Sequence, residues 1–172
     1  LQYNEDINYI LENTKILHFS SWPLSQHKSR ETMEKVLEEG RKNNILIGFD
    51  PNYHPMIWEK DHDGIEYIKN IIKKVDIIKP SEVDAERLFG EDSAIVTNGK
   101  ETLKFETLAK EIVDTTGAGD AFWSGFYTGI TKGHNLKKSL ELGFATSAYK
   151  LKYTGAIAHL PKIEEIKNMY NL

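Results

Sequence analysis

Four short apolar runs in the first hundred residues constrain the fold of this chain most. Each is almost free of internal polar residues and ends in Ser, Asp, Pro or Gly. The runs are KILHFSS (15–21), ILIGFD (45–50), VDIIKP (75–80) and AIVTNG (94–99). Strands of this kind are usually buried on both faces, as in a parallel sheet. We therefore predict a mostly parallel sheet.

Helical patterns separate these runs. Met33, Val36 and Leu37 repeat at helical spacing within residues 29–44, where Gly40 is the predicted helix stop, and isoleucines repeat in the same way in residues 64–75. Alternating strands and helices imply right-handed crossovers and an α/β layered fold. Two or three helices close the chain, at 117–132, about 136–152 and 162–171. With no internal repeat or linker, residues 1–172 are expected to form a single α/β domain.

Composition excludes several classes of protein. The formal charge is −4 and Lys and Arg form no block, so nucleic acid is not an expected partner. The absence of cysteine excludes a disulfide scaffold and Cys-ligated zinc, and it fits a reducing compartment. No apolar run has the length of a membrane span, and the first residues lack the pattern of a signal peptide. We expect a soluble, cytoplasmic protein.

The segment DTTGAGDAFWSGF (114–126) places two glycines in front of an apolar helical pattern. A helix that starts at Gly117, Ala118 and Gly119 leaves its first N–H groups unpaired, and with the helix dipole these form a site for an anion such as phosphate. Asp120 lies in the first turn beside that site. Equally, an aspartate is favourable in any first turn and the glycines can form a simple tight turn. Spacing alone leaves both interpretations open.

Further polar residues follow the predicted strands, where open α/β sheets collect their ligands. They are Ser20, Ser21, Asp50, Asn52, Ser81, Thr97 and Gly99.

The segment DTTGAGDAFWSGF resembles the C-terminal signature of the PfkB/ribokinase family of sugar kinases. The segments KILHFSSWPLS, FDPNYHPMIW, IIKPSEVDAERLFG and VTNGKE precede it in family order. The resemblance implies a ribokinase-like, Rossmann-type layered fold with a mostly parallel central sheet flanked by helices. Within the family, FDPNYHPMIW is most similar to the fructokinase and 2-keto-3-deoxygluconate kinase branch.

The resemblance assigns roles to the Gly-Ala-Gly-Asp turn. Asp120 takes the place of the catalytic base that accepts the proton of the sugar hydroxyl, a role for which a carboxylate within hydrogen-bond reach is sufficient. The amides of Gly117, Ala118 and Gly119 correspond to the anion hole that stabilises the transferred phosphoryl group.

The remaining nucleotide and Mg²⁺ residues are also assigned by resemblance. Thr97 and Gly99 match the Thr-x-Gly that meets the phosphates of ATP. Ser81 and Asp84 stand where the family has Asn-x-x-Glu, which organises Mg²⁺ through water. Ser81 could equally be a plain helix N-cap with Asp84 in the first turn.

Asn52 and His54 are the sugar contacts that the resemblance implies. The branch commonly has Arg where this chain has His54, and an Arg fork suits a substrate carboxylate or phosphate. The change favours a neutral hexose, unless His54 merely packs beside Trp58. Asp114 and Thr116 align with ligands of a monovalent cation, often K⁺, which would share the site with carbonyls of residues 152–156.

The resemblance therefore implies an ATP-dependent, Mg²⁺-requiring sugar kinase, which we expect to act on fructose and to be a homodimer. Alternatives within the class are a 2-keto-3-deoxygluconate kinase, a ribokinase and a nucleoside kinase. An alternative of another class is a catalytically silent nucleotide-binding relative. A Rossmann dinucleotide binder is excluded because no G-x-G-x-x-G follows the first strand.

Family chains are considerably longer than this one. We expect the N-terminal half, with the lid and most sugar contacts, to lie outside these 172 residues, so that they alone are not a competent kinase. Two internal joins also look short. Residues 87–99 pass from a helix into the next strand without the helix that a parallel crossover of a dozen or more residues would contain, and residues 97–117 lack the family's usual second glycine and part of a hairpin. We expect breaks between consecutive Cα atoms near 90–94 and 97–106.

Overall fold

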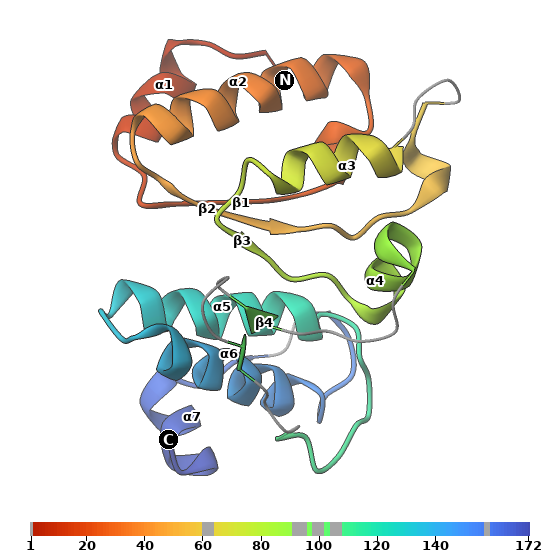
Figure 1. Cartoon of the computed structure of the whole chain (residues 1–172). Helices are drawn as coiled ribbons and strands as arrows, with labels where there is room; N and C mark the ends of the chain where they lie inside the picture. The colour runs from red at the N-terminus through yellow and green to blue at the C-terminus, as the bar shows by residue number, and fades with distance from the viewer. Residues whose placement is uncertain (1, 60–63, 91–95, 98–101, 104–107, 157–158) are drawn as a thin grey trace. The chain divides into compact units, whose positions relative to one another are not determined.

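A computed structural model describes residues 2–59, 64–90, 96–97, 102–103, 108–156 and 159–172 (Figure 1). Two compact units, Leu1–Ala94 and Ile95–Leu172, are defined by their internal contacts and are described one after the other. The expectation of a single domain over 1–172 remains a prediction. The breaks expected near 90–94 and 97–106 fall almost entirely outside the described residues.

The first unit contains a parallel sheet of three strands in the order β1-β2-β3. These are β1 (Ile16–Ser20), β2 (Leu46–Asp50) and β3 (Ile77–Ile78). β1 and β2 pair from Ile16 opposite Leu46 to Ser20 opposite Asp50, and Gly48 stands opposite Ile77. Three of the four apolar runs therefore form the predicted parallel sheet, and their carboxyl ends share one edge.

Helices α1 (Glu5–Glu12), α2 (His27–Lys42) and α3 (Gly64–Ile72) lie on one face of this sheet (Figure 1). Phe19 and Phe49 from neighbouring strands pack with ring centroids 4.8 Å apart, and Ile47, Ile68 and Leu88 complete a buried apolar core. Two 3₁₀ turns, η1 (Trp22–Leu24) and η2 (Pro55–Ile57), follow β1 and β2, and α4 (Glu82–Phe89) follows β3.

The prediction that Gly40 stops α2 is wrong. The helix continues to Lys42, and Gly40 lies buried in its last turns, where an added Cβ would be 3.6 Å from the side chains of Ile47 and Leu17. Both distances are ordinary van der Waals contacts, so Gly40 is a packed residue of the helix and not its end. The chain leaves the helix through Asn43 and turns at Asn44, whose φ is 54°.

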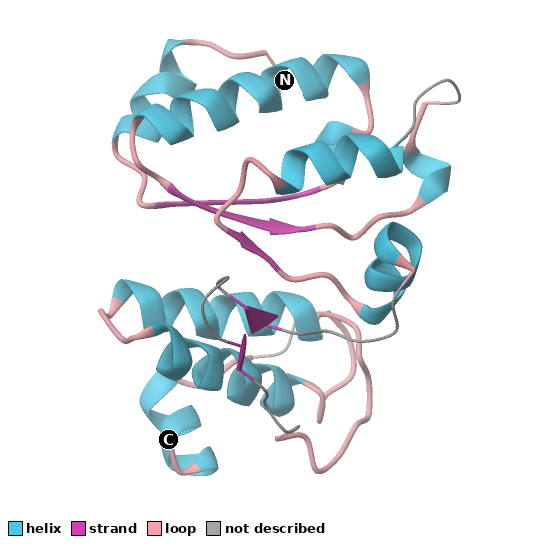
Figure 2. Cartoon of the chain, viewed as in Figure 1, coloured by secondary structure: helices cyan, strands magenta, loops and turns pink. Residues whose placement is uncertain are grey.

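The second unit is largely a helical assembly (Figure 2). It comprises α5 (Ala118–Thr131), α6 (Leu136–Lys150) and α7 (Ile163–Tyr170), with two short strands, β4 (Val96–Thr97) and β5 (Thr102–Leu103). β4 pairs antiparallel with β5, with Thr97 opposite Thr102. Among the described residues, the fourth apolar run contributes Val96 and Thr97 to this antiparallel pair.

Helices α5 and α6 pack closely because small residues face the contact. An added Cβ at Gly125 would lie 2.3 Å from Thr146 Oγ1 and 2.5 Å from the Leu142 carbonyl oxygen. Buried aromatic rings surround this contact, among them Phe122, Trp123 and Phe126. The apolar helical pattern that follows the two glycines therefore forms a buried face of α5. No helix in the described ranges is both long and apolar enough to cross a membrane.

Candidate active site

Helix α5 begins at a glycine with a left-handed backbone. Gly117 is the N-cap residue, with φ 78° and ψ 4°, and no side chain caps the helix. The N–H of Ala118 donates to the Thr115 carbonyl at 3.1 Å, whereas the N–H groups of Gly119 and Asp120 have no acceptor among the described residues. Two main-chain donors and the positive end of a helix of 14 residues thus face the approach to α5.

Only glycine fits at position 117, for two separate reasons. Its φ lies in the left-handed region, which side chains disfavour. In addition, a Cβ there would lie 2.6 Å from the carbonyl oxygen of Ala156, a contact that would force the backbone apart. The turn at residues 152–156 is therefore packed directly against the start of α5.

Asp120 occupies the first turn of α5 and is exposed. Its carboxylate makes no hydrogen bond or ion pair with any residue in the described ranges. An unpartnered carboxylate beside two unpaired N–H groups can accept a proton from a molecule that the same N–H groups hold. The structure brings Gly117, Ala118, Gly119 and Asp120 together as the helix-start interpretation predicts.

Asp114 is the most strongly held carboxylate of this region. Its Oδ1 accepts the N–H of Thr116 at 2.9 Å and its Oδ2 accepts the N–H of Gly155 at 2.7 Å. These bonds, first that of Thr116 and then that of Gly155, lower the pKa of Asp114 to about 2, so the group is ionised at neutral pH. Asp114, Thr116 and the turn at 152–156 are therefore adjacent.

A residue that sequence reasoning missed lies beside them. Lys150, the last residue of α6, is 1% exposed, and its Nζ donates to the main-chain carbonyl of Asp114 at 2.9 Å. Lys152, two residues further on, is exposed. Nothing in the sequence distinguishes the buried lysine from the exposed one, because burial here depends on a loop 36 positions earlier in the chain.

Ser81 and Asp84 form a capping box at the start of α4. Ser81 Oγ accepts the N–H of Asp84 at 3.1 Å, while Asp84 Oδ2 accepts the N–H of Ser81 at 3.1 Å and its hydroxyl at 2.7 Å. Asp84 Oδ1 accepts the N–H of Tyr53 at 2.7 Å, and the residue is 2% exposed. The N-cap interpretation is confirmed, and both carboxylate oxygens already have partners within the protein.

The predicted sugar contacts lie in the loop after β2. Asn52 has a φ of 42° and an exposed side chain, and its carbonyl accepts the Ser21 hydroxyl at 3.2 Å. His54 is exposed and caps η2, its Nδ1 accepting the N–H of Met56 at 3.3 Å. Two tyrosine rings lie beside Trp58, that of Tyr67 at 5.9 Å and that of Tyr53 at 6.2 Å between centroids.

The predicted nucleotide residues are only partly described. Thr97 ends β4, and Gly99 lies outside the described residues. No group of three or more His, Asp or Glu side chains in the described part of the chain could hold a metal ion.

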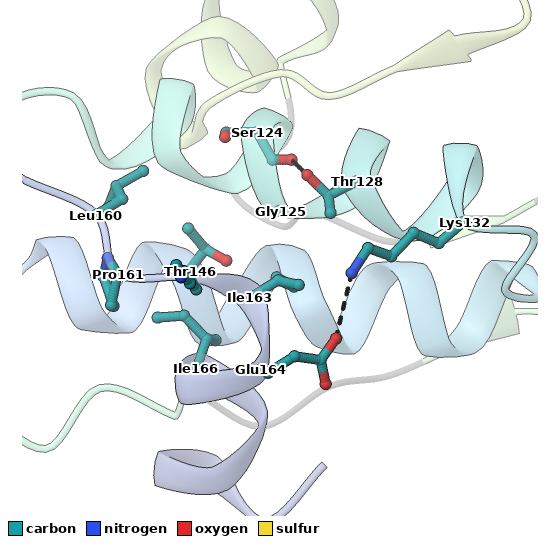
Figure 3. Close-up of a pocket in the computed structure, with 11 residues that line it drawn as sticks. Ser124, Gly125, Thr128, Lys132, Thr146, Leu160, Pro161, Ile163, Glu164 and Ile166 are labelled. Carbon is teal, nitrogen blue, oxygen red and sulfur yellow. Dashed lines mark hydrogen bonds and ion pairs between the residues drawn. The ribbon is translucent and has the colours of Figure 1, made fainter.

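A pocket of about 420 Å³ opens among α5, α6 and α7 (Figure 3). The residues that line it include Ser124, Thr128, Thr146 and Ile163. An ion pair joins the end of α5 to α7, with Lys132 Nζ 3.2 Å from Glu164 Oε1. None of the predicted site residues lines this pocket.

Comparisons with known proteins agree with the fold and the order of motifs. The model of the pfkB family carbohydrate kinases matches residues 2–94 and 89–163, two segments that meet at the first of the two short joins. An ATP-dependent 6-phosphofructokinase of Thermoanaerobacterium thermosaccharolyticum is 57% identical over 196 residues, a match that covers all of this chain and 61% of that protein. Since this chain has 172 residues, the relative contains residues within the matched region that this chain lacks.

Two solved structures show the same architecture. A Halothermothrix orenii fructokinase is 30% identical, with a TM-score of 0.66, over 83% of this chain and 58% of that one. A Vibrio cholerae O395 fructokinase, solved with fructose, ADP and calcium bound, is 21% identical, with a TM-score of 0.81, over 91% of this chain and 61% of that one. The chain thus spans about three fifths of these relatives, and it shares their ribokinase-like α/β fold. It belongs to the pfkB family of carbohydrate kinases.

Proposed function

We propose that this chain carries the catalytic part of an ATP-dependent kinase that phosphorylates a hydroxyl of a fructose-type sugar. The start of α5 is the observation that carries the proposal. There Gly119 and Asp120 offer unpaired N–H groups, and the carboxylate of Asp120 is exposed and without a partner among the described residues. The pfkB family model includes this segment.

The proposed step follows from that arrangement. The oxygen of the sugar hydroxyl attacks the γ-phosphorus of ATP, the bond between that phosphorus and the β–γ bridging oxygen breaks, and ADP leaves. Asp120 accepts the hydroxyl proton, while the N–H groups at the start of α5 stabilise negative charge on the phosphoryl oxygens. Gly117 contributes by adopting the left-handed turn that starts α5 and by leaving room for the carbonyl of Ala156.

Fructose 6-phosphate is the acceptor we favour. The support is the name of the relative that is 57% identical, an ATP-dependent 6-phosphofructokinase. Unphosphorylated fructose, the acceptor that the sequence alone favours, is the second candidate. Two observations support it: His54 in place of an Arg fork, and the similarity to the Halothermothrix orenii fructokinase.

Mg²⁺ is expected to accompany ATP, and it would neutralise charge on the phosphates. Ser81 and Asp84, which the resemblance assigns to Mg²⁺, fit that role poorly in this chain. Both oxygens of Asp84 accept hydrogens from the protein and the residue is almost completely buried. Neither Ser81 nor Asp84 therefore has a role in the proposed step.

The test is a coupled assay of ADP release with ATP and a panel of acceptors, run on the complete enzyme because the 172 residues alone are not expected to phosphorylate a sugar. Fructose 6-phosphate, fructose, 2-keto-3-deoxygluconate and ribose are compared by kcat/KM. The highest value with fructose 6-phosphate supports the proposal, and the highest value with fructose supports the second candidate. ATP binding without turnover of any acceptor would contradict both and favour a catalytically silent nucleotide-binding protein.

A further inference from the structure

The side-chain ammonium of Lys150 is buried without a carboxylate partner among the described residues. Transfer of a charged group out of water is costly unless the group is paired or well hydrogen-bonded. Lys150 is 1% exposed, yet among the described residues it forms no ion pair with a carboxylate. Its one direct partner in the described ranges is the carbonyl oxygen of Asp114, at 2.9 Å.

The surroundings of Lys150 are those of a cation site. The side chain of Asp114 is ionised and held by the N–H groups of Thr116 and Gly155, so a fixed negative charge accompanies the carbonyl oxygen. The carbonyl oxygen of Ala156, one residue after Gly155, lies against Gly117. An ionised carboxylate and main-chain carbonyls are the oxygen donors that a hard cation prefers.

The family resemblance places a free monovalent cation at Asp114, Thr116 and the carbonyls of 152–156. In this chain the donors do not fit that ion well. The carbonyl oxygen of Asp114 already accepts the Lys150 ammonium, and both carboxylate oxygens of Asp114 accept main-chain N–H groups. The ammonium of Lys150 thus supplies a positive charge at the carbonyl oxygen of Asp114.

We infer that Lys150 is a tethered replacement for the monovalent cation, so that the loop from Asp114 to Gly117 is ordered without K⁺. The loop leads directly into α5, whose first residue is Ala118. Lys150 is therefore a positioning residue: it touches no substrate, and it acts by holding the loop that presents the unpaired N–H groups and Asp120.

Thermal unfolding of the full chain tests this inference without relying on phosphoryl transfer. The melting temperature is measured in KCl, NaCl and tetramethylammonium chloride at equal ionic strength. For the wild-type chain we expect values that agree to within about 1 °C, since no site for K⁺ is open. For Lys150→Ala we expect a fall of roughly 5–10 °C in tetramethylammonium chloride, and a saturable recovery as K⁺ replaces that ion.

Two further variants separate charge from packing. Lys150→Met keeps the length of the side chain but not its charge, so its melting temperature should fall equally in all three salts. Lys137→Ala removes one exposed lysine from the same helix and should leave the melting temperature unchanged in every salt.

Three results would overturn the inference. One is a saturable stabilisation of the wild-type chain by K⁺. Another is a Lys150→Ala variant as stable as Lys137→Ala in tetramethylammonium chloride. The last is a destabilised Lys150→Ala variant that K⁺ does not rescue. Folding of Lys150→Ala only in KCl would support the inference. If that variant folds in none of the three salts, the effect of K⁺ on the melting temperature of the wild-type chain tests the inference by itself.

Discussion

Asp84 Oδ1 accepts the main-chain N–H of Tyr53 at 2.7 Å, and this bond joins the start of α4 to the loop that follows β2. The guanidinium of Arg87, one turn further along α4, donates to the carbonyl of the same Tyr53 at 2.9 Å. Both main-chain groups of Tyr53 are thus held by one helix. These two bonds also help to fix the backbone of Asn52 and His54, which flank Tyr53.

Replacing Asp84 should therefore destabilise the fold more than an ordinary polar substitution. Asp84→Asn removes one acceptor from a buried group with three donors, which should lower the free energy of unfolding by about 1–3 kcal/mol. Urea denaturation followed by circular dichroism measures this. Glu86→Gln, an exposed change on the same helix, is the control. Equal stability of the two variants would show that the Asp84 bonds contribute little.

Asp120 should be needed for turnover and not for nucleotide affinity. Asp120→Asn retains the shape of the side chain but cannot accept a proton, so the kcat of the complete enzyme should fall by roughly 10²–10⁴, the usual contribution of a general base. The Kd for a non-hydrolysable ATP analogue, measured by calorimetry, should stay close to the wild-type value. Glu111→Gln, an exposed carboxylate outside the turn, should change neither quantity. Turnover near the wild-type level in Asp120→Asn would exclude the assigned role.

The contact between α5 and α6 should not accept an added methyl group at Gly125. In Gly125→Ala the new Cβ meets Thr146 Oγ1 and the fixed carbonyl of Leu142, both closer than van der Waals contact allows. The net loss should be about 1–2 kcal/mol, because overpacking outweighs the better helix propensity of alanine. Ser124→Ala, at the neighbouring exposed position of α5, should be neutral or slightly stabilising. A melting temperature of Gly125→Ala at or above that of Ser124→Ala would contradict the packing argument.

Tyr67 should contribute to stability in a way that disappears in alkali. Its hydroxyl donates to the carboxylate of Glu34. Partial burial, followed by this bond and the charge of Glu34, raises the pKa of Tyr67 in the folded chain, while Arg30 opposes the shift. A pKa raised by folding means that the neutral group stabilises the fold fully below the ordinary pKa of about 10, and less as the pH rises above it.

The measurement is the difference in unfolding free energy between the wild-type chain and Tyr67→Phe. It should be constant from about pH 7 to 9 and should shrink above about pH 10. Tyr9→Phe, at a residue that is 69% exposed, provides the baseline for general alkaline effects. A difference that does not change with pH would mean that the hydroxyl of Tyr67 is not linked to folding.

The start of α5 could be predicted from sequence because its signals are local. Gly117 needs its left-handed backbone, and the apolar repeat that follows fixes the helix, so residues adjacent in the chain carry the information. Ser81 and Asp84 left two interpretations open, since a Ser three residues before a carboxylate suits both a capping box and a hydrated ion. Only the position of Tyr53, 31 residues away from Asp84, decides between them.

Other features depend on contacts that the sequence does not display. Gly40 is predicted to stop a helix, but the helix continues past it and Gly40 lies buried beside the side chains of Leu17 and Ile47. Lys150 reads as a solvated lysine near a helix end, and its burial follows from the path of the loop at Asp114. In each case the deciding partner comes from an element distant in the chain.

Gly117 and Gly133 have nearly the same φ, 78° and 79°, yet their surroundings allow them very different evolutionary freedom. No atom lies within 4 Å of a Cβ added at Gly133, so asparagine, which tolerates the left-handed region, can replace it at small cost. At Gly117 the Ala156 carbonyl excludes every side chain. The same contact also restricts residues 151–155, because an insertion or deletion there would carry that carbonyl either into the start of α5 or away from it. The length of that turn and the glycine at position 117 can therefore change during evolution only together.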